Sequence, residues 1–267
     1  MFKTNKFLKL AVLALISMFF LVACGTNESK DTTSGSGDTA EDDSEKLVFG
    51  VKFDTKLFGL KNTTSGDVEG FDIDIAKLLA KEVLGDETKI ELVEVTSKTR
   101  IPLLNKGDID AIIATMTITE ERKNEVDFTD VYFEAGQSLL VKKGSEIKSI
   151  EDLTKDTTVL AVKGSTSTDN IRKVAPDAQV LEFENYAEAF TALKAGKGDT
   201  LTTDNSILLG MVTEDDSFEL VGGTFTDEPY GIAVKKGNKD LLDKLNKALE
   251  TIHSNGEFDK VYDKWFE

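Results

Sequence analysis

Beyond the N-terminal segment, short runs of β-branched residues alternate with longer stretches in which apolar residues recur every three or four positions. The short runs are typical of strands, and the longer stretches are typical of amphipathic helices. One helix is expected, with Asp72 as its cap and Gly85 as its stop. Its apolar residues share one face (Phe71, Ile75, Leu78, Leu79 and Val83). Two more helices are expected, over residues 186–195 and 239–253. The alternation predicts an α/β protein with largely parallel sheets.

The N-terminal segment has the hydrophobic pattern of a secretory signal peptide. Three lysines (Lys3, Lys6 and Lys9) precede an apolar run over residues 10–23 that only Ser17 interrupts. This run is too short for a comfortable membrane-spanning helix. It ends at Cys24, the only cysteine of the chain, in the residue order found at bacterial lipoprotein processing sites. We therefore expect a signal peptide over residues 1–23 and a lipid on Cys24, rather than a cysteine buried in a core.

Residues 25–45 consist largely of Gly, Ser, Thr, Asp and Glu and are almost free of apolar side chains. Such a segment cannot offset the entropy of ordering, so residues 24–46 are expected to be a lipidated cysteine followed by a flexible linker. A lipid and a linker would hold the globular part at the extracellular face of the cell membrane, within reach of a membrane partner.

Two halves of the globular part repeat the same motifs. A strand motif recurs with identical spacing (Val48, Val51, Lys52 and Thr55 against Val159, Val162, Lys163 and Thr166). A triplet at a helix end, a turn and a strand start also recurs (Leu104, Gly107 and Asp110 against Leu193, Gly196 and Asp199). Each triplet is followed five residues later by a polar side chain, Thr115 or Asp204. Two repeats in the same order predict two similar halves.

Polar residues follow the predicted strands of both halves. In open parallel sheets, residues beyond the carboxyl ends of strands meet at the ligand crevice. Here that rule would gather residues of both charges and several hydroxyls (Lys52, Asp54, Thr115, Thr117, Ser165, Thr166 and Asp204). This is the chemistry of a site for a zwitterion.

The composition narrows the classes of function. The formal net charge is −17, and it becomes −20 without residues 1–23, which carry three positive charges and no negative one. Nucleic acid is therefore not expected as a partner. A single cysteine excludes an intramolecular disulfide, and with a single histidine, His253, zinc or triad catalysis is not expected. We expect no catalytic residue, no metal and no cofactor.

Five stretches of the globular part are distinctive: "EGFDIDIAKLLAKEVLG", "IATMTITEERKNEVDFTDVYF", "AVKGSTST", "ALKAGKGDTLTTD" and "EPYGIAVKKG". They resemble the polar amino acid family (family 3) of bacterial extracellular solute-binding proteins, the ligand-capturing lipoproteins of ABC importers. The resemblance covers nearly all of residues 47–267. It implies a two-lobed periplasmic-binding-protein-like fold (type II), with two parallel-rich sheets joined by a two-stranded hinge. Lobe 1 would comprise residues 47–136 and 229–267, and lobe 2 residues 137–228, with crossings near 135–139 and 227–230.

The resemblance also implies a binding site for a free amino acid. Arg122 would bind the α-carboxylate, with Thr117 beside it and Thr166 of the second lobe on the same group. Asp204 would bind the α-ammonium group. A planar guanidinium donates two parallel hydrogen bonds to a carboxylate, which a lysine cannot do. The simpler interpretation is that both charges are solvated and both threonines cap strand ends.

Selectivity for the ligand side chain depends on charge. Arg122 and Asp204 already balance the two backbone charges of an amino acid, so a further buried cation requires an anion. Arg100 and Lys52 resemble the positions that bind the side-chain carboxylate in aspartate- and glutamate-binding members, with Ser97 as a helper. The expected ligand is therefore acidic, and glutamine, the isostere of glutamate, is the alternative. If both cations instead point into water, the charge argument fails.

The family usually places an aromatic wall against the ligand, which Phe53 or Phe58 would supply here unless they belong to the core. The resemblance further implies a monomer that presents its loaded form to an ABC permease in the membrane. An enzyme, a sensor domain and a structural lipoprotein are the rival classes. Turnover of a substrate would favour the first, a downstream signalling segment the second, and a lack of saturable amino acid binding the third.

Overall fold

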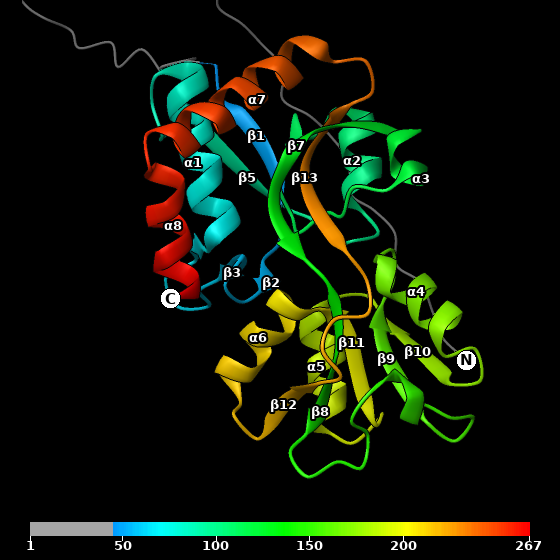
Figure 1. Cartoon of the computed structure of the whole chain (residues 1–267). Helices are drawn as coiled ribbons and strands as arrows, with labels where there is room; N and C mark the ends of the chain where they lie inside the picture. Colours follow the sequence, from blue (N-terminus) through cyan, green and yellow to red (C-terminus); the bar gives the residue numbers. More distant parts are fainter. Residues whose placement is uncertain (1–44) are drawn as a thin grey trace, which may run out of the picture. The chain divides into compact units, whose positions relative to one another are not determined.

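The computed structural model describes residues 45–267. The predicted signal peptide, Cys24 and nearly all of the predicted linker lie outside the described residues. The described part contains two five-stranded sheets and a small three-stranded one, with helices packed against both larger sheets (Figure 1).

The first large sheet and its helices form what we call lobe 1. The strand order is β5 (Ile90–Glu94), β1 (Leu47–Val51), β6 (Ala111–Ile112), β13 (Glu228–Lys235) and β7 (Val126–Ala135). β1 is parallel to both β5 and β6, whereas β13 is antiparallel to both β6 and β7. The helices of this lobe are α1 (Phe71–Leu84), α2 (Arg100–Lys106), α3 (Glu120–Lys123), α7 (Lys239–Ser254) and α8 (Glu257–Phe266).

The second large sheet and its helices form lobe 2. The strand order is β10 (Gln179–Phe183), β9 (Thr158–Val162), β11 (Thr200–Asp204), β8 (Gln137–Lys142) and β12 (Phe218–Val221). β9 is parallel to β10 and β11, whereas β8 is antiparallel to β11 and β12. The helical segments are η1 (Ile150–Asp152), α4 (Thr166–Val174), α5 (Tyr186–Lys194) and α6 (Asn205–Glu214).

The chain passes between the lobes twice. β7 of lobe 1 continues through Gly136 into β8 of lobe 2, and β12 leads back over residues 222–227 into β13. In each sheet, the strand that runs against its neighbours is the one that arrives from the other lobe. The fold is therefore a mixed α/β, two-lobed one. The sheets are less purely parallel than the hydrophobic pattern alone predicts, because a connection between lobes reverses one strand in each.

The repeated motifs occupy equivalent places in the two lobes. β1 and β9 both lie between two parallel neighbours. Asp110 accepts a hydrogen bond from the Val48 N–H at the start of β1 (2.9 Å), and Asp199 accepts one from the Thr158 N–H at the start of β9 (2.7 Å). The same carboxylate contact fixes the same strand pair in each lobe, so the repeated sequence motifs reflect a structural repeat.

Helix α1 confirms the predicted end but not the predicted cap. Gly85 adopts the left-handed conformation (φ 76°) and donates its N–H to the Lys81 carbonyl, which ends the helix. The N-cap is Gly70, however, and no side chain caps the helix. Asp72 lies inside the first turn and is fully buried. The prediction that Asp72 is a cap was wrong, because the helix begins one residue before it.

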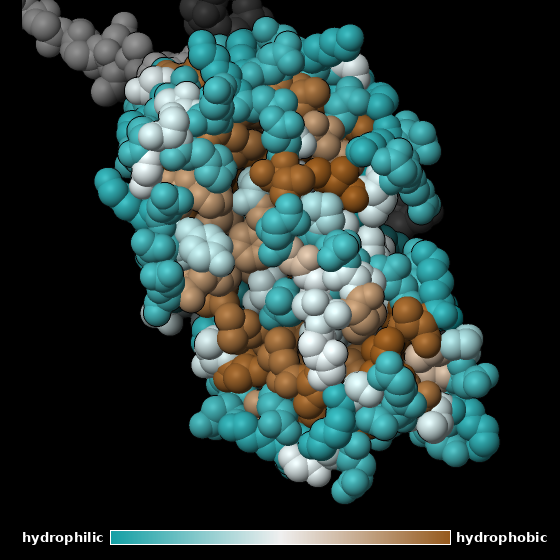
Figure 2. All heavy atoms as spheres, viewed as in Figure 1, coloured by the Kyte–Doolittle hydropathy of each residue, from teal (hydrophilic) through white to brown (hydrophobic). Residues whose placement is uncertain are grey.

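A cluster of aromatic rings fills the core of lobe 1. Phe58 is fully buried, with its ring 5.2–6.0 Å from four others (Phe71, Phe133, Tyr230 and Phe266). Phe58 is therefore a core residue and not a wall for a ligand. On the outside, Figure 2 shows hydrophilic residues over most of this face, with apolar residues between them around α6, where Leu209 is exposed.

The small three-stranded sheet extends lobe 1 toward lobe 2. Its strands are β2 (Asp54–Thr55), β3 (Gly59–Lys61) and β4 (Val68–Glu69), paired antiparallel in that order. β2 contacts α5 of lobe 2. The segment that follows β1 thus touches the other lobe.

Candidate functional site

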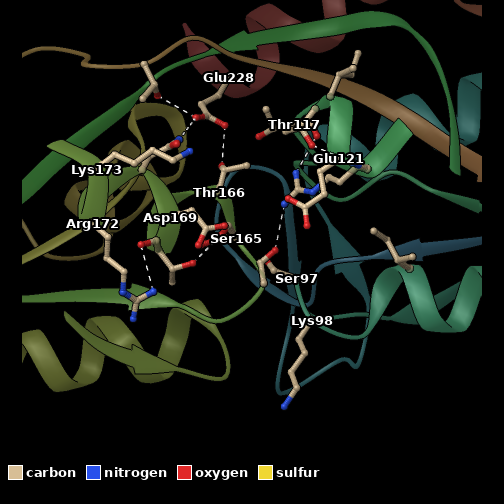
Figure 3. Close-up of a pocket in the computed structure, with 18 of the residues that line it drawn as sticks. Ser97, Lys98, Thr117, Glu121, Ser165, Thr166, Asp169, Arg172, Lys173 and Glu228 are labelled. Atoms are coloured by element: carbon tan, nitrogen blue, oxygen red, sulfur yellow. Dashed lines mark hydrogen bonds between the residues drawn. The ribbon is translucent and has the colours of Figure 1, made fainter. Parts of the chain in front are cut away.

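A cavity of about 830 Å³ lies between the lobes. Its walls include five residues from the predicted site (Ser97, Thr117, Arg122, Ser165 and Thr166) together with Gly164 and Glu228. Figure 3 shows Thr166 and Glu228 pointing toward one another and joined by a hydrogen bond. Three further predicted residues, Lys52, Arg100 and Asp204, do not line this cavity and are buried.

Arg122 connects the two lobes. It lies on α3, whose cap is the Thr119 side chain, which accepts the Arg122 N–H (3.1 Å). Its guanidinium donates to the Thr117 carbonyl at 2.8 Å and, across the crevice, to the Gly164 carbonyl at 3.1 Å. The side chain is not solvated, since Arg122 is only 9% exposed. Burial lowers the pKa of the guanidinium, and the charge of Asp204 is the strongest effect that opposes this shift.

Asp204 lies at the end of β11 and is buried. One carboxylate oxygen, Oδ2, accepts the Tyr230 hydroxyl at 2.5 Å. The other, Oδ1, has no hydrogen-bond partner among residues 45–267. Burial and then the charge of Glu228 raise the pKa of this carboxyl to about 7. Within the described part of the chain, Asp204 and Arg122 form no ion pair within 4.0 Å, so each keeps hydrogen-bonding capacity for a third group.

Lys52 and Arg100 are both buried, which contradicts the interpretation that they point into water. The Lys52 ammonium donates to the Ser97 hydroxyl (2.9 Å) and lies 5.1 Å from the centre of the Tyr186 ring. The Arg100 guanidinium donates to the Ala114 carbonyl (2.7 Å), whereas its Nε finds no partner among the residues described. Burial is the largest cause that lowers the pKa of Lys52, to about 7, and that of Arg100, to about 9.

The hydroxyl groups predicted to face the ligand already have partners within the protein. Thr166 donates to Glu228 (2.7 Å) and accepts from the Gln137 amide (2.9 Å). Ser165 donates to the Val162 carbonyl (2.6 Å). Both residues stand at the start of α4, where a helix presents unpaired backbone N–H groups to an anion. The backbone N–H groups at this position, more than the side-chain hydroxyls, are suited to binding a carboxylate.

Thr115 holds an unusual backbone conformation beside the buried cations. Its φ of 47° lies in the left-handed region, which a β-branched residue rarely adopts. Its N–H donates to the Asp72 carboxylate (3.1 Å) and its hydroxyl to the Ala114 carbonyl (2.8 Å). These contacts hold the segment whose Ala114 carbonyl accepts the Arg100 hydrogen bond.

Phe53 does not reach the large cavity. It lines a separate cavity of about 250 Å³, and the Lys61 ammonium lies 5.2 Å from the centre of its ring. Tyr186 is the aromatic side chain that stands against Lys52. It lies three residues after the last residue of β10 and begins α5, so the rule that residues after strands face the crevice would have found it.

Sequence reasoning also missed Glu228, Gln137 and Asp72. Glu228 begins β13 and is buried, and it accepts hydrogen bonds from Thr166 and from Asn170 (2.9 Å). Gln137 begins β8, and its Oε1 is buried without a partner in residues 45–267. Glu228 opens the stretch "EPYGIAVKKG", whereas no sequence signal separates Asp72 from an exposed helix residue.

All the charged side chains that are buried in the described residues gather in this one region. They are three cations (Lys52, Arg100 and Arg122) and three anions (Asp72, Asp204 and Glu228). Their formal charges balance. Since an unpaired buried charge is costly, a ligand without net charge leaves this balance intact.

None of the helices in residues 45–267 combines the length and the apolarity that a membrane span requires. The same residues hold no group of three or more side chains suited to a metal ion.

Comparisons with known proteins agree with this arrangement. Residues 47–267 match the family described as "Bacterial extracellular solute-binding proteins, family 3". The chain is 62% identical, over 98% of its length and 97% of the relative, to the ABC transporter glutamine-binding protein GlnH of Bacillus subtilis (strain 168). It is 59% identical, over 90% of its length and 95% of the relative, to the glutamine-binding protein of Geobacillus stearothermophilus.

Among solved structures, an ancestral arginine-binding protein bound to glutamine has a TM-score of 0.78 and 48% identity, over 83% of this chain and 97% of that one. Two lobes with matching topology, an interlobe cavity and a complete family match together establish the class of the protein. The chain belongs to family 3 of the bacterial extracellular solute-binding proteins and is the amino acid-binding component of an ABC transporter.

Proposed function

We propose that the amino acid bound by this protein is glutamine. The observation that carries the proposal is the balance of the six buried charges, because a glutamine zwitterion adds no net charge to it. The two relatives at 62% and 59% identity are glutamine-binding proteins by name, and the similar ancestral protein was solved with glutamine.

The expectation of an acidic ligand rested on an incomplete count of the buried charges. That count set Arg122 against Asp204 and left Arg100 and Lys52 in need of an anion from the ligand. Asp72 and Glu228 supply two anions from the protein itself. The pKa values of Lys52 and Asp72 both lie near 7. If a proton moves from Lys52 to Asp72, the sum of the buried charges is unchanged. The ligand therefore does not need a charged side chain.

The unpartnered atoms suggest how glutamine is held. Arg122 and the start of α4 offer donors to the α-carboxylate. Among residues 45–267, Asp204 Oδ1 and Gln137 Oε1 are acceptors without partners on paired positions of β11 and β8, and they suit the α-ammonium group. Arg100 Nε, a donor without a partner in the same residues, suits the carbonyl oxygen of the side-chain amide. Each of these three buried polar atoms would then gain a partner on binding.

We also infer that the protein works at the outer face of the cell membrane as a monomer, anchored by a lipid on Cys24 after removal of residues 1–23. The support for the removal of residues 1–23 and for the anchor is the sequence pattern of residues 3–24. The lipid anchor would keep the protein near the permease that receives the amino acid.

Calorimetric titration of the ligand-stripped protein with glutamine, glutamate, aspartate and asparagine tests the proposal. Glutamine should bind with a Kd of about 1 μM or lower, and glutamate at least about tenfold more weakly. Arg122→Lys should weaken glutamine binding by about a hundredfold or more, because a lysine cannot span the Thr117 and Gly164 carbonyls and a carboxylate together.

Arg172→Lys is the matched control. Arg172 lines the same cavity but pairs with Glu182 at the surface, so its exchange should change the glutamine Kd by no more than about threefold. Tighter binding of glutamate than of glutamine would establish the acidic ligand instead. The absence of saturable binding by all four amino acids would refute both.

A further inference from the structure

The carboxylate of Asp72 is the least expected charge in the site. It is fully buried, and its two hydrogen bonds come from neutral donors, the Thr115 N–H (3.1 Å) and the Tyr132 hydroxyl (2.9 Å). No lysine or arginine among residues 45–267 forms an ion pair with it within 4.0 Å. Burial raises the pKa of this carboxyl to about 7. Asp72 is thus a costly group that the local fold does not explain.

Neither contact of Asp72 requires a negative charge. An asparagine at position 72 has the same shape, and its amide oxygen would accept the Thr115 N–H. Its NH₂ group would donate to the Tyr132 oxygen, because a hydroxyl both donates and accepts. A structural role alone would therefore be met by a neutral residue, which points to a use for the charge itself.

The groups that face Asp72 show where its charge acts. Lys52 follows β1 and Arg100 lies on α2, and these are the cations that oppose the rise of the Asp72 pKa. Tyr132 of β7 and Thr115 after β6 complete its surroundings. Lys52 and Arg100 are also the two buried cations that are not needed for the backbone of an amino acid ligand.

Charge arithmetic links Asp72 to the ligand. With Asp72, the buried site holds three cations and three anions. Without its charge, one cation would be left over. A ligand that brings one extra carboxylate, such as glutamate, would then restore the balance, whereas glutamine would not. One unit of buried charge has a large effect on the affinity for a charged ligand, because charges interact strongly where water is excluded.

We propose that Asp72 is a specificity-determining residue that makes the site accept an uncharged ligand side chain, by supplying from inside the protein one of the three anions that balance the three buried cations. It does so without touching the ligand. This inference rests on the amino acid site proposed above and identifies what sets its selectivity.

Asp72→Asn tests the inference through the ratio of the Kd values for glutamate and glutamine, measured by calorimetry at pH 7.5. The variant should lower this ratio by about tenfold or more relative to the parent protein, through tighter glutamate binding, weaker glutamine binding or both. If Asp72 only supports the structure, both ligands will weaken alike and the ratio will not move. That result would overturn the inference.

Asp74→Asn is the matched control. Asp74 lies in the same first turn of α1, but its carboxylate accepts from Lys264 (2.6 Å) and Trp265 (2.9 Å) at the edge of the lobe. The same chemical exchange there should leave the ratio within about twofold. A shift as large as that of Asp72→Asn would show that the effect is not specific to the site.

The parent protein offers a second measurement that needs no variant. Lowering the pH from 8 to 6 favours the protonated forms of Asp72, Lys52 and Asp204 and so makes the site more positive. The ratio of the glutamate Kd to the glutamine Kd should fall over this range, and a constant ratio would contradict the inference. The parent ratio at pH 7.5 tests the glutamine proposal separately, since the inference is judged only on how the ratio changes.

Discussion

At the scale of single residues, the site contains two charged side chains, Arg122 and Asp204, whose hydrogen-bonding capacity is only partly used within the described residues. Arg122 has a guanidinium held by two carbonyls, and Asp204 has one carboxylate oxygen bound to Tyr230 and one free within the described residues. Neither charge neutralises the other directly. A zwitterion fits between two such groups, because each of its ends finds a charge-assisted hydrogen bond.

The titration of Asp204 gives a prediction about pH. Its pKa is raised to about 7 by burial and by Glu228, while Arg122 and Arg100 oppose the rise. The carboxylate is charged above this pKa and protonated below it, and only the charged form attracts an ammonium group. Affinity for glutamine should therefore fall as the pH drops from 8 to 5.5, by up to about tenfold per unit below pH 7.

Calorimetry in buffers of different ionisation enthalpy checks this prediction. Binding at pH 6 should release a proton, because the ligand ammonium restores the charge of Asp204. In Asp204→Asn, glutamine binding should be weakened by about a hundredfold or more at every pH. Near-parental binding by that variant would show that the ammonium group lies elsewhere.

At the scale of elements, the two lobes meet through helix α5 and helix α6. Asp54 of lobe 1 accepts the Tyr186 N–H (2.7 Å) at the first position of α5 in lobe 2. A carboxylate there satisfies an unpaired N–H and complements the positive end of the helix dipole. On α6, a Cβ added to Gly210 would lie 2.6 Å from the Lys56 carbonyl oxygen of lobe 1. Both contacts exist only when the lobes touch.

Gly210→Ala separates the stability of α6 from the closing of the lobes. Without ligand, alanine should raise the stability by up to about 1 kcal/mol, because it favours the helix over the unfolded chain. With the lobes together, its methyl group would collide with the Lys56 carbonyl. Thermal unfolding should therefore occur at a temperature about 2–4 °C higher without glutamine, while the glutamine Kd rises by about tenfold or more.

Leu209→Ala serves as the comparison, since Leu209 is the preceding residue of α6 and is 41% exposed. Its exchange should leave the glutamine Kd within about twofold. If Gly210→Ala binds glutamine as tightly as the parent protein, the contact with Lys56 does not belong to the ligand-bound arrangement.

At the scale of the whole molecule, binding and transport require the two lobes and a partner in the membrane. Each lobe contributes charged groups to the site, with Lys52, Arg100 and Arg122 from lobe 1 and Asp204 from lobe 2. In the proposed arrangement, the ligand would be part of the interface between the lobes, and its capture would change the surface that a permease meets.

The proposed anchor gives a prediction at this scale. In cells that express the Cys24→Ser variant, the protein should move from the membrane fraction to the medium, because a polar linker without a lipid has no affinity for the bilayer. Fractionation and immunoblotting measure this. Purified Cys24→Ser protein should bind glutamine like the parent. Retention of the variant in the membrane fraction would mean that another segment anchors it.

Much of the fold follows from local patterns. The spacing of apolar residues locates α1 and its end at Gly85, and repeated motifs reveal two similar lobes. These features are readable because a helix or strand face is set by neighbours a few positions apart. The start of α1 at Phe71, with Asp72 buried inside it, was not readable. An aspartate near the start of a helix is as typical of an exposed cap as of a buried residue in the first turn, so the sequence does not distinguish the two.

The sequence by itself therefore determined the two-lobed α/β architecture, the family resemblance and the residues Arg122 and Asp204 as candidates for the two ends of an amino acid. Only the tertiary structure decided how many charges share the site. Asp72 and Glu228 come from distant parts of the chain, and their contribution depends on burial and on the cations that act on them, Lys52 and Arg100 for Asp72 and Arg122 for Glu228. Electrostatic balance is a property of groups brought together in space, so no count along the chain reveals it.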